Sequence, residues 1–179
     1  MASDLAGYLD NLEMVAEVRR LDRFTIPRAQ QLLQRSNQFN LTTIRFTEAE
    51  LQRVAADPSH YGFTIRLRDR LGDNGIIAVL VTRADGPSLV VENWVMSCRV
   101  LERRVEEMTL GVLASHARGR GCNELVGEYR PTSKNAMVAD LYPRLGFASL
   151  KGQAGRFRLS LSEVPSGSDL PITVKIIEE

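Results

Sequence analysis

A group of polar and charged residues follows a valine-rich segment near the middle of the chain. These residues are Ser97, Cys98, Arg99, Arg103 and Arg104. We predict a strand over 88–97 and a helix over 103–118, so the group falls at a helix N-terminus, where backbone N–H groups favour anions. Arginine pairs well with phosphate, and a cysteine in such surroundings can act as a nucleophile. The group therefore predicts a local anion site with Cys98 as a candidate acyl carrier; a buried, inert cysteine is the alternative.

The elements that must position this group follow from hydrophobic periodicity. Alternating or continuous apolar residues predict strands over 14–21, 61–71, 76–82, 88–97, 123–130, 147–150, 156–161 and 172–177. Apolar residues at helical spacing predict helices that start near Pro27 and at Thr47, and two more over 103–118 and 135–145. Three antiparallel strands before a strand–helix–strand unit predict one mixed α/β domain.

Local signals mark the ends of several elements. Thr47 and Glu50 stand in the reciprocal positions of a capping box, and Asp57-Pro58 ends the helix that this box starts. The stretch 72–75 (GDNG) predicts a hairpin turn, because Asn-Gly accepts the positive φ that such turns require. Gly146 predicts a left-handed cap at the end of the last helix.

Length and composition bound the class of protein. The chain has 179 residues, of which 44% are apolar and 25% charged, as in ordinary globular domains. We expect a lead-in over 1–13, a folded domain over 14–164, and an extension over 165–179 that holds a flexible link (165–168) and one short strand. The net charge of +1 gives no electrostatic footprint for nucleic acid or a membrane surface.

Other features point to a cytoplasmic protein without a metal. The two cysteines are too few for a disulfide framework, so a reducing compartment is expected. The cysteines and histidines have no metal-ligand spacing, so no metal site is expected. No apolar run approaches the ~20 residues that span a membrane, and no secretion signal is evident at the N-terminus.

Two segments resemble the GNAT (Gcn5-related N-acetyltransferase) family. Asn135, Tyr142 seven residues later, and Gly146-Phe147 match a GNAT pattern, and 91–106 stands where GNAT proteins bind the pyrophosphate of coenzyme A. The resemblance implies an α/β (α+β) GNAT fold, with a central mixed, mostly antiparallel sheet flanked by helices. It also implies that two parallel neighbouring strands splay apart beside Arg99 and open a slot for a pantetheine arm.

A narrower resemblance is to the C-terminal region of FkbH-like proteins, of HAD superfamily subfamily IIIC. The segments that carry it are NQFNLTT (37–43), GDNGI (72–76), SCRVL (97–101) and GEYRPTSKN (127–135). Family members in polyketide pathways take a glyceryl unit from a phosphorylated glycerate and place it on an acyl carrier protein. Their phosphatase domain uses a DxD motif, which this chain lacks. The resemblance therefore implies a lone C-terminal domain with an acyl carrier protein and a HAD-type phosphatase domain as partners.

The resemblance also assigns roles to residues. Glu92 is implied as a general base, with an ion pair to a neighbouring strand as the structural alternative. Tyr142 is implied as the acid that protonates the leaving thiolate, with a packed aromatic residue as the alternative. The implied contacts to coenzyme A or a phosphopantetheine thioester are Ser97, Arg99, Val100, Arg103, Arg104 and Asn135, although Asn135 is equally good as an N-cap. The implied substrate contacts are Asn37, Asn40, Thr42 and Trp94, with a self-bonded turn as the alternative for the loop.

One departure from the family pattern concerns the phosphate loop. The pattern places glycines where this chain has Glu102 and Arg104, although glycine lets backbone N–H groups approach a phosphate. Weakened coenzyme A binding is therefore expected, and a carrier-bound phosphopantetheine arm is the preferred ligand. The sequence leaves three functions open: acyl transfer on such arms, a catalytically silent carrier-docking module, and an ordinary N-acetyltransferase.

Overall fold

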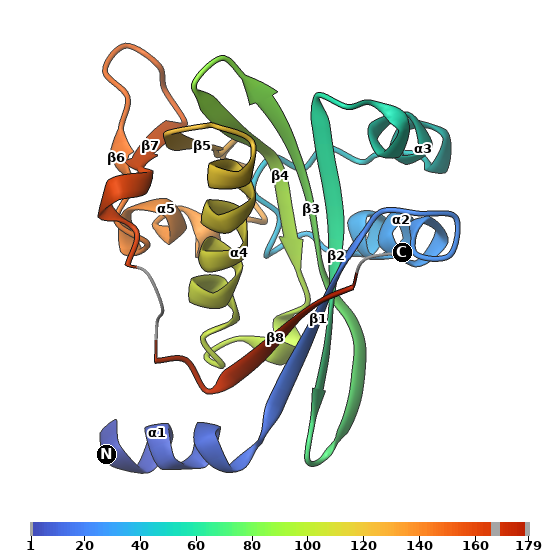
Figure 1. Ribbon diagram of the computed structural model, residues 1–179, viewed down its shortest axis with the longest axis vertical. Coiled ribbons are helices and arrows are strands. Elements are labelled where there is room, and N and C mark those ends of the chain that lie inside the picture. The colour runs from blue at the N-terminus through green and yellow to red at the C-terminus, as the bar shows by residue number, and fades with distance from the viewer. Residues whose placement is uncertain (1, 166–168, 178–179) are drawn as a thin grey trace.

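The computed structural model describes residues 2–165 and 169–177, and it consists of one sheet between two layers of helices (Figure 1). The strands are β1 (Met14–Arg20), β2 (His60–Asp69), β3 (Gly72–Asp85), β4 (Ser88–Met96), β5 (Glu124–Glu128), β6 (Ala148–Ser149), β7 (Arg156–Ser160) and β8 (Ile172–Ile177). The helices are α1 (Ala2–Asn11), α2 (Ile26–Arg35), α3 (Glu48–Ala56), α4 (Val105–Gly119) and α5 (Leu141–Arg144). Short 3-10 turns occupy Cys98–Val100, Ala136–Val138 and Leu161–Glu163.

The sheet has the mixed, mostly antiparallel topology that the sequence predicts. Its strand order is β6-β7-β5-β4-β3-β2-β1-β8. Strands β1 to β4 pair antiparallel in succession, whereas β4 and β5 pair in parallel, because α4 carries the chain across between them. Strand β8 pairs in parallel with β1 and forms one edge of the sheet. The predicted last strand, 172–177, is thereby confirmed.

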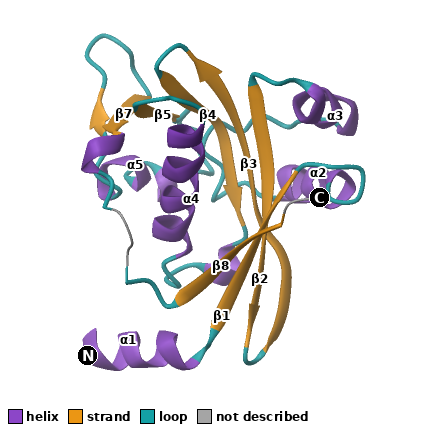
Figure 2. Cartoon of the chain, viewed as in Figure 1, coloured by secondary structure: helices purple, strands orange, loops and turns teal. Residues whose placement is uncertain are grey.

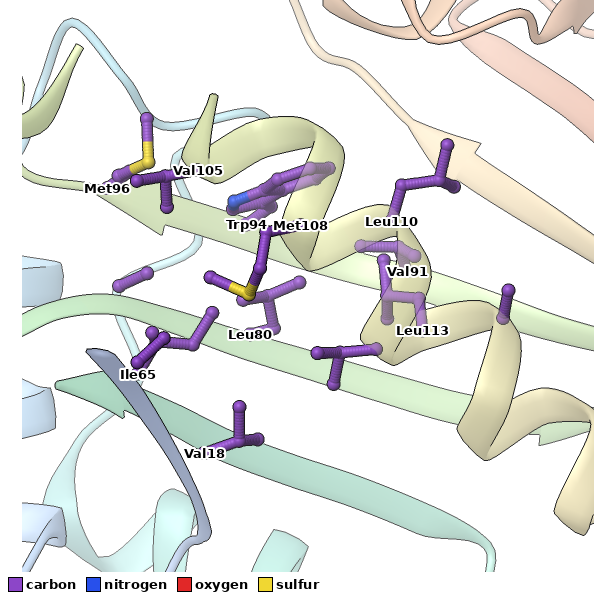
Figure 3. Close-up of a cluster of buried hydrophobic side chains, with 14 of the residues drawn as sticks. Val18, Ile65, Leu80, Val91, Trp94, Met96, Val105, Met108, Leu110 and Leu113 are labelled. Carbon is purple, nitrogen blue, oxygen red and sulfur yellow. The ribbon is translucent and has the colours of Figure 1, made fainter. Parts of the chain in front are cut away.

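The main core lies between α4 and the sheet (Figure 3). Trp94 and Met96 from β4 face Val105 and Met108 from α4, and all four side chains are buried. A second, smaller cluster joins α2 and α3 to the opposite face of the sheet. Figure 2 shows these two helices on the other side of the sheet from α4. Strand β4 is therefore covered on both faces, which accounts for its continuous apolar sequence.

Several predicted boundaries are confirmed by hydrogen bonds. The capping box at the start of α3 is formed: Glu50 N donates to Thr47 Oγ1 (3.2 Å), and Thr47 N donates to Glu50 Oε2 (2.8 Å). Gly146 adopts a φ of 92°, the left-handed conformation expected after α5. These signals act between neighbours in the chain, so the sequence alone was enough to find them.

Three local predictions were wrong. The β2–β3 turn comes at Arg70 and Leu71, because the Asp69 carboxylate accepts hydrogen bonds from Leu71 N (2.8 Å) and Gly72 N (3.1 Å), and Gly75 lies in an irregularity of β3 instead. The helix predicted over 135–145 is divided into a 3-10 turn and the short α5. Helix α4 begins at Val105, after a left-handed residue, and not at Arg103 as predicted.

The predicted lead-in over 1–13 contains helix α1. Of the predicted link over 165–168, only Pro165 belongs to the described residues.

Two glycines give a matched test of this packing. A methyl group at Gly127 would lie 2.2 Å from the Tyr142 ring, whereas one at Gly111 in α4 meets nothing within 4 Å. We expect Gly127→Ala to lower the free energy of unfolding by about 2 kcal/mol through overpacking. Gly111→Ala should raise it by about 0.5–1 kcal/mol, because alanine loses less backbone entropy in a helix. Chemical denaturation measures both, and equal effects of the two substitutions would contradict this packing.

Candidate functional site

The polar group identified in the sequence forms a loop between β4 and α4. Residues 98–100 make a 3-10 turn, and Glu102 and Arg104 then adopt left-handed backbone conformations, with φ of 64° and 63°. These are the two positions at which the family pattern has glycine. The loop therefore keeps a glycine-like backbone path while it carries two large charged side chains, a conformation that costs an ordinary residue roughly 1–2 kcal/mol.

Two of the predicted phosphate-binding arginines are held by carboxylates. Arg103 Nη1 lies 2.6 Å from Asp69 Oδ2, and the Asp69 side chain is only 3% exposed. Burial opposes ionisation of Asp69, but hydrogen bonds from Asn74 and Arg103 hold its pKa below the usual value. Arg104 pairs with Glu107 (2.6 Å) and donates to Asp169 O (3.0 Å). Both arginines thus brace the loop, and their binding of a cofactor phosphate, which would require them to leave these carboxylates, stays a prediction.

The space beside the α4 N-terminus is acidic. A cleft of about 360 Å³ lies there, bordered by Glu102, Glu106, Glu107, Arg104, Arg144, Phe39, Leu101, Met137 and Leu145. Burial raises the pKa of the Glu106 carboxyl. Arg104 is paired with Glu107, and Arg144 lies 3.2 Å from Asp140. Carboxylates here offset the positive end of the helix, so the cleft disfavours a pyrophosphate.

The parallel strands β4 and β5 separate beyond Val91 and Gly127, which is where their pairing ends. The gap is filled by residues 39–42, here called the inserted segment. On one side, Leu41 N donates to Trp94 O (3.1 Å) and Met96 N donates to Phe39 O (3.1 Å). On the other side, Arg130 N donates to Leu41 O (2.9 Å). The inserted segment thus bonds to both sides of the gap, as an added strand would.

Side chains reinforce the inserted segment. Asn135 Nδ2 donates to Asn40 O (2.9 Å) and to Arg130 O (3.0 Å). Thr42 Oγ1 donates to Glu92 O (2.9 Å), and Asn40 Nδ2 donates to Ser36 O (3.1 Å). Asn40, Thr42 and Asn135 are all buried. Of these bonds of the loop, only that from Asn40 to Ser36 is local, as the self-bonded alternative expected, whereas the others join the loop to β4 and to Asn135.

This filling contradicts the predicted slot for a pantetheine arm. The strands do splay, but main-chain groups of β4 that could meet an incoming amide already bond to the inserted segment. Asn40, Thr42 and Asn135 make structural hydrogen bonds here, so the contacts of Asn40 and Thr42 with substrate and of Asn135 with cofactor stay predictions. Sequence reasoning found the polar residues of this loop but missed that they pair with a strand more than fifty positions away.

Tyr142 is packed in the core. Its side chain is 1% exposed and lies against Gly127, and its hydroxyl interacts with the backbone of Glu128 without a hydrogen bond of standard geometry. Burial, together with the nearby Glu128 carboxylate, raises the pKa of Tyr142 far above its usual range. The packed-aromatic alternative describes this environment, and the acid role stays a prediction.

Glu92 lies at an irregularity in the β3–β4 pairing. Its carboxylate lies 2.9 Å from Arg83 Nε on β3 and 3.5 Å from His60 Nε2 on β2. This is the ion pair to a neighbouring strand that the sequence left open as an alternative. None of the clefts found among the described residues is lined by Glu92. The general-base role of Glu92 stays a prediction.

Two other predicted contacts are structural. Trp94 is fully buried and packs with Phe39, their ring centroids 6.1 Å apart. Val100 is buried as well, and its N–H donates to Ser97 O (3.3 Å), which leaves no donor for a ligand. Both residues thus serve the core in this structure, and their contacts with substrate or cofactor stay predictions.

The remaining predicted residues come together in an open, basic cleft. The cleft measures about 470 Å³ and is lined by Asn37, Ser97, Cys98, Arg99, Arg28, Gln31, Leu32, Arg35, Ser36, Gln38 and Phe39. Cys98 is exposed, and its Sγ lies 3.6 Å from Gln38 Oε1. Sequence reasoning missed Arg28 and Arg35 on α2, because nothing local connects them to the loop after β4.

The described residues give no site for a metal and no membrane-crossing element. No cluster of three or more His, Cys, Asp or Glu side chains is placed to hold a metal ion within 2–165 and 169–177. No helix in these ranges combines the length and the apolar character needed to cross a membrane.

Comparison with solved structures identifies the architecture. The ribosomal-protein-S18-alanine N-acetyltransferase of Escherichia coli superposes with a TM-score of 0.60 over 87% of this chain and 98% of its own, at 17% identity. The GNAT fold is therefore the fold of this chain. The GNAT domain of S. lividans PAT matches with a TM-score of 0.58 over 80% and 89%, at 16% identity. Spermidine N-acetyltransferase from Vibrio cholerae, solved with CoA and spermine, matches with a TM-score of 0.59 over 83% and 97%, at 12% identity.

Identities this low establish the GNAT fold and nothing finer. No protein-family model matches the sequence, and no curated protein matches it significantly. The predicted GNAT fold is thus confirmed by the architecture, whereas the narrower resemblance to FkbH-like proteins stays a prediction.

The left-handed residue Glu102 can be tested by substitution. We expect Glu102→Gly to be more stable than Glu102→Ala by about 1 kcal/mol, because only glycine adopts this φ without steric cost. The same two substitutions at Ser115, an exposed position inside α4, should rank in the opposite order. Chemical denaturation of the four variants measures this, and one common ranking at both sites would contradict a left-handed Glu102.

Tyr142 allows a second test. Tyr142→Phe removes a buried hydroxyl that makes no hydrogen bond of standard geometry, so the free energy of unfolding should rise by about 1 kcal/mol. Tyr8→Phe is the matched control, because Tyr8 is exposed and its change should stay within about 0.5 kcal/mol. A loss of stability in Tyr142→Phe would mean that the hydroxyl makes a stabilising hydrogen bond.

Proposed function

We propose that this chain is an acyl-transfer domain that works on phosphopantetheine thioesters, and that Cys98 carries the acyl group. The observation behind the proposal is the open cleft beside β4, in which an exposed thiol lies among arginines. A nucleophilic cysteine needs access to its substrate and positive surroundings that favour the thiolate. Cys122, the other cysteine, is buried and so lacks the exposure of Cys98.

The chemistry of this transfer is a double exchange of thioesters. The Cys98 thiolate attacks the carbonyl carbon of a donor thioester, a new C–S bond forms, and the donor C–S bond breaks. The departing thiolate takes up a proton, and the acyl group stays on Cys98. A thiol at the end of a second arm then loses its proton, attacks the same carbonyl carbon and releases Cys98. No redox step or metal is involved.

Because the gap between β4 and β5 is filled, the pantetheine arm must enter the protein by another route. A pantetheine arm cannot replace the inserted segment without breaking its bonds to β4, and the cleft by the α4 N-terminus is acidic. An arm that enters the basic cleft from solvent avoids both obstacles. Arg28, Arg35 and Arg99 at this cleft are also complementary to an acidic acyl carrier protein. The resemblance to FkbH-like proteins favours a glyceryl or similar polar acyl group.

A second candidate is a catalytically silent docking module for a carrier protein, which would accompany a HAD-type phosphatase domain. The buried Tyr142 hydroxyl and the two braced loop arginines favour it. The two candidates share the partner and differ in whether a covalent intermediate forms.

Intact-protein mass spectrometry separates them. We expect incubation with a glyceryl-loaded acyl carrier protein to add one acyl group to the domain, which Cys98→Ser should abolish and Cys122→Ser should retain. Carrier binding without any adduct would support the docking module. An adduct that survives in Cys98→Ser would overturn the proposed role of Cys98. Free coenzyme A should bind more weakly than the loaded acyl carrier protein in calorimetry.

A further inference from the structure

The basic cleft brings together three arginines from two distant parts of the chain. Arg28 and Arg35 lie seven residues apart on α2, which places them on the same helix face, and Arg99 comes from the loop after β4. All three side chains are exposed at the cleft. The fold thus places the two positive charges of α2 at the same cleft as the positive charge of Arg99.

These arginines differ from others in the chain by their partners. Arg66, Arg68, Arg83, Arg103 and Arg104 each pair with a carboxylate. For the cleft arginines, the interactions within 2–165 and 169–177 are to neutral oxygens: Arg28 donates to Gln31 Oε1 (2.7 Å), and Arg99 to Ser97 Oγ (3.3 Å) and Asn74 O (3.5 Å). None of the residues that line the cleft is acidic. The cleft therefore holds three charges that no carboxylate within 2–165 and 169–177 pairs with.

A fourth arginine, Arg45, offsets the negative C-terminal end of α2, which would otherwise repel an anion from the cleft. The C-terminal end of α2 borders the cleft, and unpaired carbonyl groups at a helix C-terminus carry a partial negative charge. Arg45 Nη1 donates to Leu33 O (2.8 Å) and also to Gln34 O, and its other nitrogen bonds to Asn37 Oδ1. The guanidinium of Arg45 thus caps these carbonyls and leaves the field of the cleft positive.

From this arrangement we infer that Arg28, Arg35 and Arg99 form a binding site for the phosphate monoester of a small organic ligand. A dianion with three free oxygens suits several guanidinium groups, each of which can donate two parallel hydrogen bonds. The Ser97 hydroxyl and the Asn37 and Gln38 amides line the same cleft and add neutral donors. A carboxylate or phosphodiester carries one charge and would leave more of the positive field unmatched.

The inference shares the cleft with the proposed function but does not depend on acyl transfer. Phosphate recognition needs only the arginines, whereas the proposed function needs the Cys98 thiol. A carrier arm bears a phosphodiester, so comparison of a monoester with a diester distinguishes a small phosphorylated ligand from the arm itself.

Isothermal titration with simple probes tests the site. We expect methyl phosphate to bind saturably at constant ionic strength, and dimethyl phosphate and acetate to bind at least about tenfold more weakly. Arg35→Gln should weaken methyl phosphate binding by about tenfold or more, as should Arg99→Gln. Arg53→Gln, at an exposed arginine of α3 outside the cleft, is the matched control and should change affinity by less than about twofold.

Three outcomes would overturn the inference: no saturable binding of methyl phosphate, equal binding of the diester, or the same loss of affinity in Arg53→Gln. Circular dichroism of each variant shows whether it is folded. Retained phosphate binding without an adduct on Cys98 contradicts only the proposed function. An adduct on Cys98 without phosphate binding contradicts only the present inference.

Discussion

The arrangement of this molecule depends on how the gap between β4 and β5 is filled. Two parallel strands that diverge leave main-chain donors and acceptors without partners, and buried groups of this kind must find hydrogen bonds. The inserted segment provides them on both sides, and Asn135 adds a side-chain clamp. Because the partners come from the same chain, the sheet is completed without any ligand, and the site must form elsewhere.

The charged side chains also differ between the two sides of the inserted segment. On the α4 side of the inserted segment, glutamates border the helix N-terminus, and the arginines of the loop brace it through Asp69 and Glu107. On the α2 side, arginines remain without carboxylate partners, and Arg45 caps the helix end. The exit of β4 thus separates an acidic cleft from a basic one, although both are built from neighbouring residues of one loop. A GNAT fold can therefore be kept while the polarity of its surface clefts is redistributed.

The sequence predicts most of the fold and only part of the site. The strands, the capping box at Thr47 and the cap at Gly146 depend on periodicity and short-range hydrogen bonds, which a single chain reveals. The turn after β2 comes earlier than predicted, because the Asp69 carboxylate accepts hydrogen bonds from the backbone N–H groups of Leu71 and Gly72. The inserted segment depends on hydrogen bonds between residues about fifty positions apart, such as Leu41 with Trp94, and the basic cleft brings together Arg28 and Arg99, about seventy positions apart. Such contacts leave no local pattern, so site residues transferred by resemblance were divided among the core, an ion pair and the cleft.

Phe39 borders both clefts, since its ring stands at the edge of each of them and packs on Trp94 between them. A shared wall makes the occupancy of two cavities interdependent: a guest that displaces the ring on one side changes the room available on the other. Thermodynamic linkage then requires the influence to be mutual and equal in free energy. An occupant of either cleft that moved Phe39 would therefore alter the affinity of the other cleft for its own ligand.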